Sequence, residues 1–165
     1  VKKNKEDVYI KALEKELNEP FNFDIGGETI AVNLKGIADR IDSFGDTVRI
    51  IDYKTGLTET KDLKLKELEE LTQPNKKNKA FQILMYAYLY NKEFNISNSQ
   101  LRSGIISFRK LSNGFMPFKM DKEESIGEEI LTDFETVLQT IFKEMLDTSI
   151  PFQHQPEALY CEFCG

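Results

Sequence analysis

The sequence has 165 residues, 40% of them hydrophobic and 30% charged, and a formal net charge of −6 at pH 7. This length and composition are typical of one globular domain with its own core, and they argue against a disordered chain. No apolar run approaches the roughly 20 residues of a membrane-spanning helix. The acidic balance disfavours a protein that holds nucleic acid through a broad basic surface, although a bound cation would change the local sign of the charge.

The first half of the chain is predicted to contain one helix followed by strands. Ile10, Leu13 and Leu17 recur at helical spacing among charged residues, which predicts an amphipathic helix over residues 5–17 that ends at Pro20. Four strand-like segments follow, with hairpin turns indicated by Gly26-Gly27 and Gly45-Asp46: residues 21–23, 29–34, 35–42 and 48–54.

The second half is predicted to contain two long helices. Residues 57–79 are highly charged and lack aromatic side chains, which predicts a mobile insertion with a short helix near Leu63–Leu71. The helices are predicted at Ala80–Tyr90 and around the apolar stripe Ile130–Met145. Between them a hairpin is predicted, with strands at Leu101–Arg109 and Phe115–Met120. This order of elements predicts a mixed α/β domain around a central sheet over residues 1–150, followed by a tail over residues 151–165.

Two predicted strands carry charged residues on otherwise apolar faces. Alternate residues of a strand share a face, which groups Asp39 with Ile37 and Ile41 on one strand and Asp52 with Lys54 on the next. With the turn at the centre of the hairpin, a regular ladder sets Asp39 opposite Asp52, with Cβ atoms about 4.5–5.5 Å apart. Two carboxylates this close are expected to share a proton or to bind a cation. Oxygen ligands of this kind suit Mg²⁺ or Mn²⁺.

Lys54 lies two residues beyond Asp52 on the same face. An ammonium group there can stabilise negative charge on a reacting phosphate or orient the attacking hydroxide. The alternative is a structural ion pair in which Lys54 neutralises Asp39 or Asp52. Because buried ion pairs stabilise a fold poorly compared with apolar side chains, we favour the chemical role.

Three blocks of sequence together resemble a known family. They are Gly36-Ile37-Ala38-Asp39-Arg40-Ile41-Asp42, then Ile50-Ile51-Asp52-Tyr53-Lys54-Thr55-Gly56, then Gln82-x-x-x-Tyr86. In this order and spacing they resemble the PD-(D/E)XK nuclease superfamily, and within it the C-terminal nuclease domains of RecB and AddB, which are subunits of helicase–nucleases that process DNA ends. The resemblance implies a restriction-endonuclease-like fold, with a central mixed sheet flanked by helices.

The resemblance also implies a catalytic set and a metal-ligand set that share two aspartates. The catalytic set is Asp39, Asp52, Lys54, Gln82 and Tyr86, and the metal ligands are Asp39, Asp52 and the backbone carbonyl of Tyr53. At positions i and i+4, Gln82 and Tyr86 share one face of their helix. Their alternative interpretation is a helix flank with a surface glutamine and a half-buried tyrosine.

Two features depart from the RecB and AddB pattern. Those enzymes carry a metal-binding histidine on a helix upstream of the first block, whereas the single histidine here is His154. That helix is expected to lie before Val1, and the activity of this chain alone stays an open question. AddB-like nucleases bind an iron–sulfur cluster through four cysteines, which Cys161 and Cys164 resemble in part; half a zinc site or two idle thiols are the alternatives. A cluster is expected only in a longer protein.

The sequence therefore predicts a Mg²⁺- or Mn²⁺-dependent DNA nuclease, in the role of an exonuclease domain of a RecB/AddB-like helicase–nuclease of DNA repair and recombination. Lys76, Lys77 and Lys79 are candidates for binding the DNA backbone, or else form a solvated loop. Arg40, on the strand face opposite Asp39, is expected to form an outer salt bridge. The expected partners are DNA and a helicase domain or subunit, with no membrane, in the cytoplasm. The alternative is a catalytically inactive DNA-binding or scaffolding module with the same fold.

Overall fold

A five-stranded sheet with the order β1-β2-β3-β5-β6 forms the centre of the domain, and the predicted mixed α/β class is confirmed. The computed structural model describes residues 7–73, 77–96 and 100–151. Neighbouring strands are antiparallel except β3 and β5, which are parallel because a helical crossover joins them. The strands of this sheet are β1 (Val8–Ile25), β2 (Glu28–Phe44), β3 (Thr47–Lys54), β5 (Gln100–Ser107) and β6 (Phe115–Pro117). The other elements are α1 (Asn78–Phe94), α2 (Glu128–Leu146), the 3-10 helices η1 (Thr60–Leu63), η2 (Leu68–Thr72) and η3 (Phe108–Asn113), and a two-stranded sheet of β4 (Lys64–Leu65) and β7 (Lys119–Met120).

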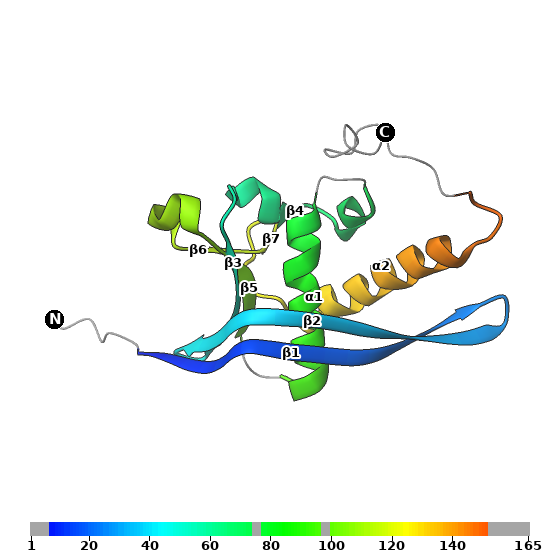
Figure 1. Cartoon of the computed structure of the whole chain (residues 1–165), viewed down its shortest axis with the longest axis horizontal. Coiled ribbons are helices and arrows are strands. Elements are labelled where there is room, and N and C mark those ends of the chain that lie inside the picture. The colour runs from blue at the N-terminus through cyan, green and yellow to red at the C-terminus, as the bar shows by residue number, and fades with distance from the viewer. Residues whose placement is uncertain (1–6, 74–76, 97–99, 152–165) are drawn as a thin grey trace.

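The predicted N-terminal helix is wrong, because this part of the chain is strand β1. It pairs with β2 along nearly its whole length, and the two strands form a long ribbon along one side of the molecule (Figure 1). Of the residues that suggested a helix face, only Leu17 is buried, while Ile10 and Leu13 are exposed. Pro20 lies inside β1 and not at the end of an element. An edge strand such as β1 tolerates proline where the missing N–H would face solvent.

Both predicted hairpin turns are confirmed. Ile25 pairs with Glu28 across the first turn, and Phe44 pairs with Thr47 across the second. The segments predicted as separate strands at 21–23, 29–34 and 35–42 are parts of β1 and β2.

The predicted inward face of β2 needs one correction, since Ile37 is exposed. Ala38 and Ile41 are both buried, so the alternation of inward residues shifts by one between them. This shift lies beside the irregular part of β1, where Glu14 adopts a left-handed φ of 46°. Strand β2 therefore changes its inward face just where it reaches Asp39.

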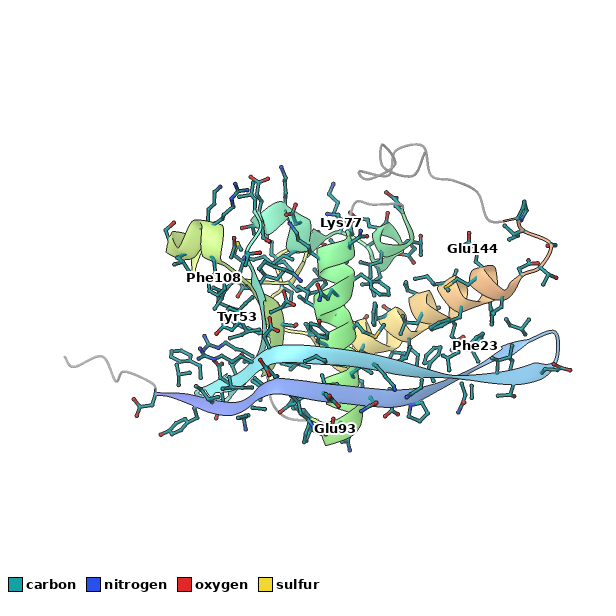
Figure 2. All side chains as sticks on the ribbon, viewed as in Figure 1. Phe23, Tyr53, Lys77, Glu93, Phe108 and Glu144 are labelled. Atoms are coloured by element: carbon teal, nitrogen blue, oxygen red, sulfur yellow. The ribbon has the colours of Figure 1, made fainter. Side chains whose placement is uncertain are left out.

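The two predicted helices are confirmed and form the core with the sheet. Helix α1 packs against the inner face of the sheet, and Ile83, Leu84, Ala87 and Leu89 within it are fully buried. Helix α2 packs against α1 through Phe134, whose ring meets the rings of Phe81 and Tyr88 edge-on. Further along α2, Phe142 contacts Phe21 and Phe23 of the β1–β2 ribbon; Figure 2 labels Phe23 on this ribbon.

The segment that follows β3 differs from the prediction. Its leucines at positions 63, 65, 68 and 71 are all buried, while most of its charged side chains face outward. Two 3-10 helices and strand β4 take the place of the single short helix expected near Leu63–Leu71. Residues 57–73 are thus packed into the domain through four buried leucines, a pattern that the high charge of the segment concealed.

Strands β5 and β6 confirm the predicted hairpin in part. Residues 108–113 form η3 and do not prolong the strand, and the second predicted strand is divided between β6 and β7. Strand β6 approaches β5 closely at Gly104, where a Cβ atom would clash with the backbone carbonyl of Met116. Among the described residues, no helix has the length and apolar character needed to cross a membrane.

Candidate active site

The candidate site lies where β2 and β3 separate. The predicted register is confirmed from Phe44–Thr47 to Arg40–Ile51, and the ladder ends there. Asp39 and Asp52 would be the next pair, but β2 turns away at this point while β3 continues beside β5 as far as Lys54. One carboxylate oxygen of Asp39 accepts a hydrogen bond from the backbone N–H of Tyr53 at 2.7 Å. We call this opening the β2–β3 fork.

Asp52 lies in the fork, and its carboxylate is almost fully buried. Its residue is only 4% exposed, and its Oδ1 atom accepts hydrogen bonds from Lys54 and from the side-chain amide of Gln82, both at 3.3 Å. Its Oδ2 atom lies 3.0 Å from the Lys54 ammonium but accepts no well-directed hydrogen bond from any described residue. Burial raises the pKa of Asp52, the nearby charge of Asp39 adds to the rise, and Lys54 opposes it. The site therefore holds a buried carboxylate whose charge is only partly compensated.

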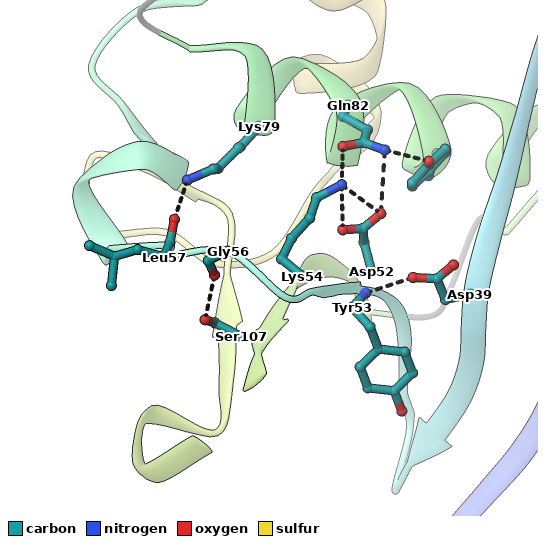
Figure 3. Close-up of polar contacts among 10 residues, drawn as sticks. Asp39, Asp52, Tyr53, Lys54, Gly56, Leu57, Lys79, Gln82 and Ser107 are labelled. Atoms are coloured by element: carbon teal, nitrogen blue, oxygen red, sulfur yellow. Dashed lines mark hydrogen bonds and ion pairs between the residues drawn. The ribbon is translucent and has the colours of Figure 1, made fainter. Parts of the chain in front are cut away.

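Helix α1 completes the cluster from the opposite side. The Lys54 ammonium donates a hydrogen bond to the Gln82 side-chain carbonyl at 2.8 Å, and the amide nitrogen of Gln82 donates to the Tyr86 hydroxyl at 2.6 Å. Figure 3 shows this chain of contacts running from β3 to the helix, with Asp39 at the edge of the fork. Gln82 thus contacts Lys54 and Asp52 directly, and Tyr86 joins the cluster through Gln82. Burial raises the pKa of the Tyr86 phenol.

A comparison with protein families assigns the chain to a known superfamily. The model of the PD-(D/E)XK nuclease superfamily matches residues 2–165. The chain belongs to this superfamily. A central sheet flanked by helices, with strands β1 to β3 antiparallel and β5 parallel to β3, is consistent with the restriction-endonuclease-like fold expected from the sequence.

Other comparisons are more distant. A solved structure described as "Crystal structure of SSO0001" is similar over 76% of this chain and 50% of its own, with 18% sequence identity and a TM-score of 0.29. The chain thus spans about half the length of that structure. No curated protein matches the sequence.

Members of this superfamily are expected to use a divalent cation, and the donors at the fork fit one. Asp39 and Asp52 supply hard oxygen ligands, and the Oδ2 atom of Asp52 is buried without a directed hydrogen bond. Mg²⁺ commonly takes only one or two protein carboxylates and completes its shell with water and substrate phosphate. Within the described ranges no group of three or more His, Cys, Asp or Glu side chains gathers to hold a metal. The fork therefore suits a cation that is held by few protein ligands and completes its coordination with water and with a substrate phosphate.

Two of the three predicted DNA-binding lysines, Lys77 and Lys79, lie at the start of α1. The ammonium of Lys77 donates to the backbone carbonyls of Lys61 and Lys64, at 3.2 and 2.6 Å. That of Lys79 donates to the carbonyl of Leu57 at 2.8 Å and to Asp62 at 2.9 Å. Both side chains tie the 57–73 segment to the helix, so a phosphate would have to displace these contacts. Three residues with predicted roles, Lys76, Cys161 and Cys164, lie outside the described residues, as does the single histidine, His154.

A second polar cluster, on the opposite face of β3, was missed in the sequence. Asp42 is fully buried and accepts two hydrogen bonds from Arg49, at 2.7 and 3.0 Å. Arg40 also pairs with Asp42 and contacts the Tyr53 hydroxyl at 3.4 Å, so the predicted salt bridge forms, but with a buried carboxylate and not at the outer surface. The signal was available, because the confirmed register places Asp42 directly opposite Arg49. The ring of Tyr53 then stacks on Phe108, a contact that no strand pattern indicates.

Proposed function

We propose that this chain is a divalent-cation-dependent nuclease domain that hydrolyses phosphodiester bonds of DNA. Membership of the PD-(D/E)XK superfamily supports nuclease activity in general. The observation that carries the proposal for this chain is the cluster at the fork. A buried carboxylate, an ammonium and an amide there contact one another, at the point where the sheet opens.

Each side chain has a role in this proposal that follows from its contacts. Asp39 and Asp52, with the backbone carbonyl of Tyr53, would hold the cation, which supplies Lewis acidity toward the phosphate and toward a water molecule. Lys54 now compensates the charge of Asp52. With a cation in that role, the ammonium is free to stabilise charge that develops on the phosphate. Gln82 keeps Lys54 in place by accepting its hydrogen bond, and Tyr86 fixes the amide orientation of Gln82.

The biological setting that we propose is an exonuclease domain of a RecB/AddB-like helicase–nuclease in DNA repair and recombination. The support is the resemblance of the three sequence blocks, and a helicase domain or subunit would be the partner. Cys161 and Cys164 belong to this proposal as part of an iron–sulfur or zinc site completed elsewhere in a longer protein.

The test is cleavage of end-labelled linear DNA with Mg²⁺ or Mn²⁺, using the wild-type chain, Lys54→Ala and a matched control, Lys92→Ala. Lys92 is also a lysine in an ion pair, with Glu135 at 3.0 Å, but it lies in the last turn of α1. We expect metal-dependent cleavage that is lost in Lys54→Ala and kept in Lys92→Ala.

Calorimetric measurement of metal binding distinguishes a residue that acts in the reaction, such as Lys54, from a residue that binds the metal, such as Asp52. Lys54→Ala is expected to keep its affinity for Mn²⁺, whereas Asp52→Asn is expected to lose most of it. If the wild-type chain binds Mn²⁺ and DNA but does not cut, the inactive DNA-binding module takes the place of this proposal. Cleavage that survives Lys54→Ala would remove the lysine from the mechanism.

A further inference from the structure

Helix η3 begins at the same end of the sheet as the fork. Strands β3 and β5 are parallel, and Lys54 pairs with Ser107, the last residue of β5. The Ser107 hydroxyl donates a hydrogen bond to the Gly56 carbonyl at 2.9 Å, which ties the ends of the two strands together (Figure 3). Phe108 therefore leaves the sheet one strand away from the candidate catalytic lysine, at a strand spacing of about 4.8 Å.

The ring of Phe108 forms an exposed aromatic surface. It stacks almost parallel on Tyr53, with ring centroids 5.5 Å apart and an interplanar angle of 8°, yet Phe108 remains 53% exposed. Figure 2 labels both residues on the same side of the molecule. Tyr53 is itself part of the fork, since its backbone N–H bonds to Asp39, while its ring points away from Lys54 (Figure 3). The stack is thus a fixed, flat surface beside the fork.

The residues that follow Phe108 add positive charge to this surface. Arg109 and Lys110 are both exposed, and neither forms a salt bridge with a residue that the structure describes. Leu111, next in η3, is 62% exposed. In a chain with a net charge of −6, this combination of an open aromatic ring and two adjacent cations favours an anionic ligand with flat faces.

We propose that Phe108, supported by Tyr53, is a stacking site for a base of an unpaired DNA strand that extends from the fork, and that Arg109 and Lys110 bind the phosphates of that strand. A base inside a duplex is covered on both faces by its neighbours, so away from the duplex ends an exposed ring can stack only on a base that has left the duplex. This proposal rests on the proposed nuclease function and adds to it a preference for DNA held as an unpaired single strand.

The experiment is equilibrium binding of labelled oligonucleotides to the 165-residue chain, followed by fluorescence anisotropy. Ca²⁺, which takes the same oxygen ligands, replaces Mg²⁺, and recovery of intact strands confirms that no cleavage occurs. Three ligands of equal length are compared: oligothymidine, a strand of abasic sites and a duplex. Phe108→Ala is compared with Phe108→Tyr, which keeps the ring, and with Phe94→Ala. Phe94 is a matched control, since it is 48% exposed and packs on Tyr90 at 4.6 Å in the last turn of α1.

The expected result is a loss specific to bases in a single strand. Phe108→Ala should weaken oligothymidine binding by about 5- to 150-fold, as expected for one stacked base, and should leave abasic and duplex binding within about twofold. Phe108→Tyr and Phe94→Ala should bind like the wild type, and unchanged circular dichroism excludes misfolding. Equal losses of affinity for oligothymidine and for the abasic strand would show that Phe108 has a structural role and does not stack on a base. No loss, or no measurable binding by the wild type, would overturn the proposal.

The two proposals can fail separately. If the chain never cuts DNA but its binding to oligothymidine depends on Phe108, the stacking site stands and the nuclease proposal falls. If the Phe108→Ala variant cuts DNA as efficiently as the wild-type chain, the nuclease proposal stands and the stacking site falls.

Discussion

Gly36 of β2 is the position at which a single added carbon should disturb the site most directly. A Cβ atom built on Gly36 would lie 2.8 Å from Cε1 and 2.9 Å from Cδ1 of Tyr86, and 3.3 Å from the side chain of Leu89. Ordinary contacts of a Cβ atom begin near 3.4 Å. Gly36→Ala therefore forces the Tyr86 ring, which is only 8% exposed and fixed on α1, to move away from β2.

The size of the effect follows from two opposing terms. Replacing glycine by alanine in a strand gains about 0.5–1 kcal/mol from reduced chain entropy, whereas overpacking a core costs about 1–3 kcal/mol. The difference is a net loss of up to about 2.5 kcal/mol in the free energy of unfolding, and we expect a value near the middle of this range, about 1–2 kcal/mol. The ring movement also loosens the 2.6 Å hydrogen bond from Gln82 to the Tyr86 hydroxyl, and with it the position of Lys54. Because a misplacement of about 1 Å can cost on the order of 100-fold in rate, cleavage should fall by about 10- to 100-fold.

Urea unfolding of Gly36→Ala, Tyr86→Ala and the double variant measures the change in the free energy of unfolding. In the Tyr86→Ala background the added carbon meets no ring, so Gly36→Ala should then be neutral or stabilising. Gly56→Ala serves as the control, because its Cβ atom would meet nothing within 4 Å, and it should change stability by less than about 0.5 kcal/mol. Equal destabilisation by Gly36→Ala with and without the Tyr86 ring would refute the steric argument.

Two further predictions concern the buried carboxylates on the two faces of the sheet. Asp42→Ala should lower the free energy of unfolding by about 3–5 kcal/mol, since it leaves Arg40 and Arg49 without their buried partner; a loss below about 1 kcal/mol in urea unfolding would show that the cluster is dispensable. Because burial raises the pKa of Asp52 in the folded state, its protonated form stabilises the fold below the unfolded pKa of about 3.9, and this contribution is lost as pH rises through the folded pKa. Asp52→Asn should therefore raise the free energy of unfolding at pH 7 in the absence of divalent cations, with a smaller gain at pH 4, and a loss of stability at pH 7 would contradict this sign.

Much of the local structure around the site could be predicted from the sequence. The glycine turn sets the register of β2 and β3, because a two-residue turn leaves one regular way to pair the strands. The helix spacing of Gln82 and Tyr86 is equally local. The charged residues of β3 could be identified because they interrupt an apolar alternation. The PD-(D/E)XK resemblance rested on these same positions, and the superfamily is confirmed.

What the sequence could not determine depends on contacts between distant segments. Ile10, Leu13 and Leu17 fit a helix as well as an irregular strand, and only pairing with β2 decides between them. The end of the β2–β3 ladder at Arg40 is likewise a tertiary result. Because β3 continues beside β5 while β2 turns away, Asp39 meets the backbone of Tyr53 and does not lie directly across from Asp52.

The sequence by itself thus determined which side chains are candidates for the chemistry, since their spacing is fixed by turns and by strand and helix periods. Only the tertiary structure decided how they meet. The crossover through α1 brings Gln82 onto Lys54, and the parallel pairing of β5 sets Phe108 against Tyr53. Both contacts join residues far apart along the chain, and their geometry depends on packing of the whole core, which no local pattern encodes.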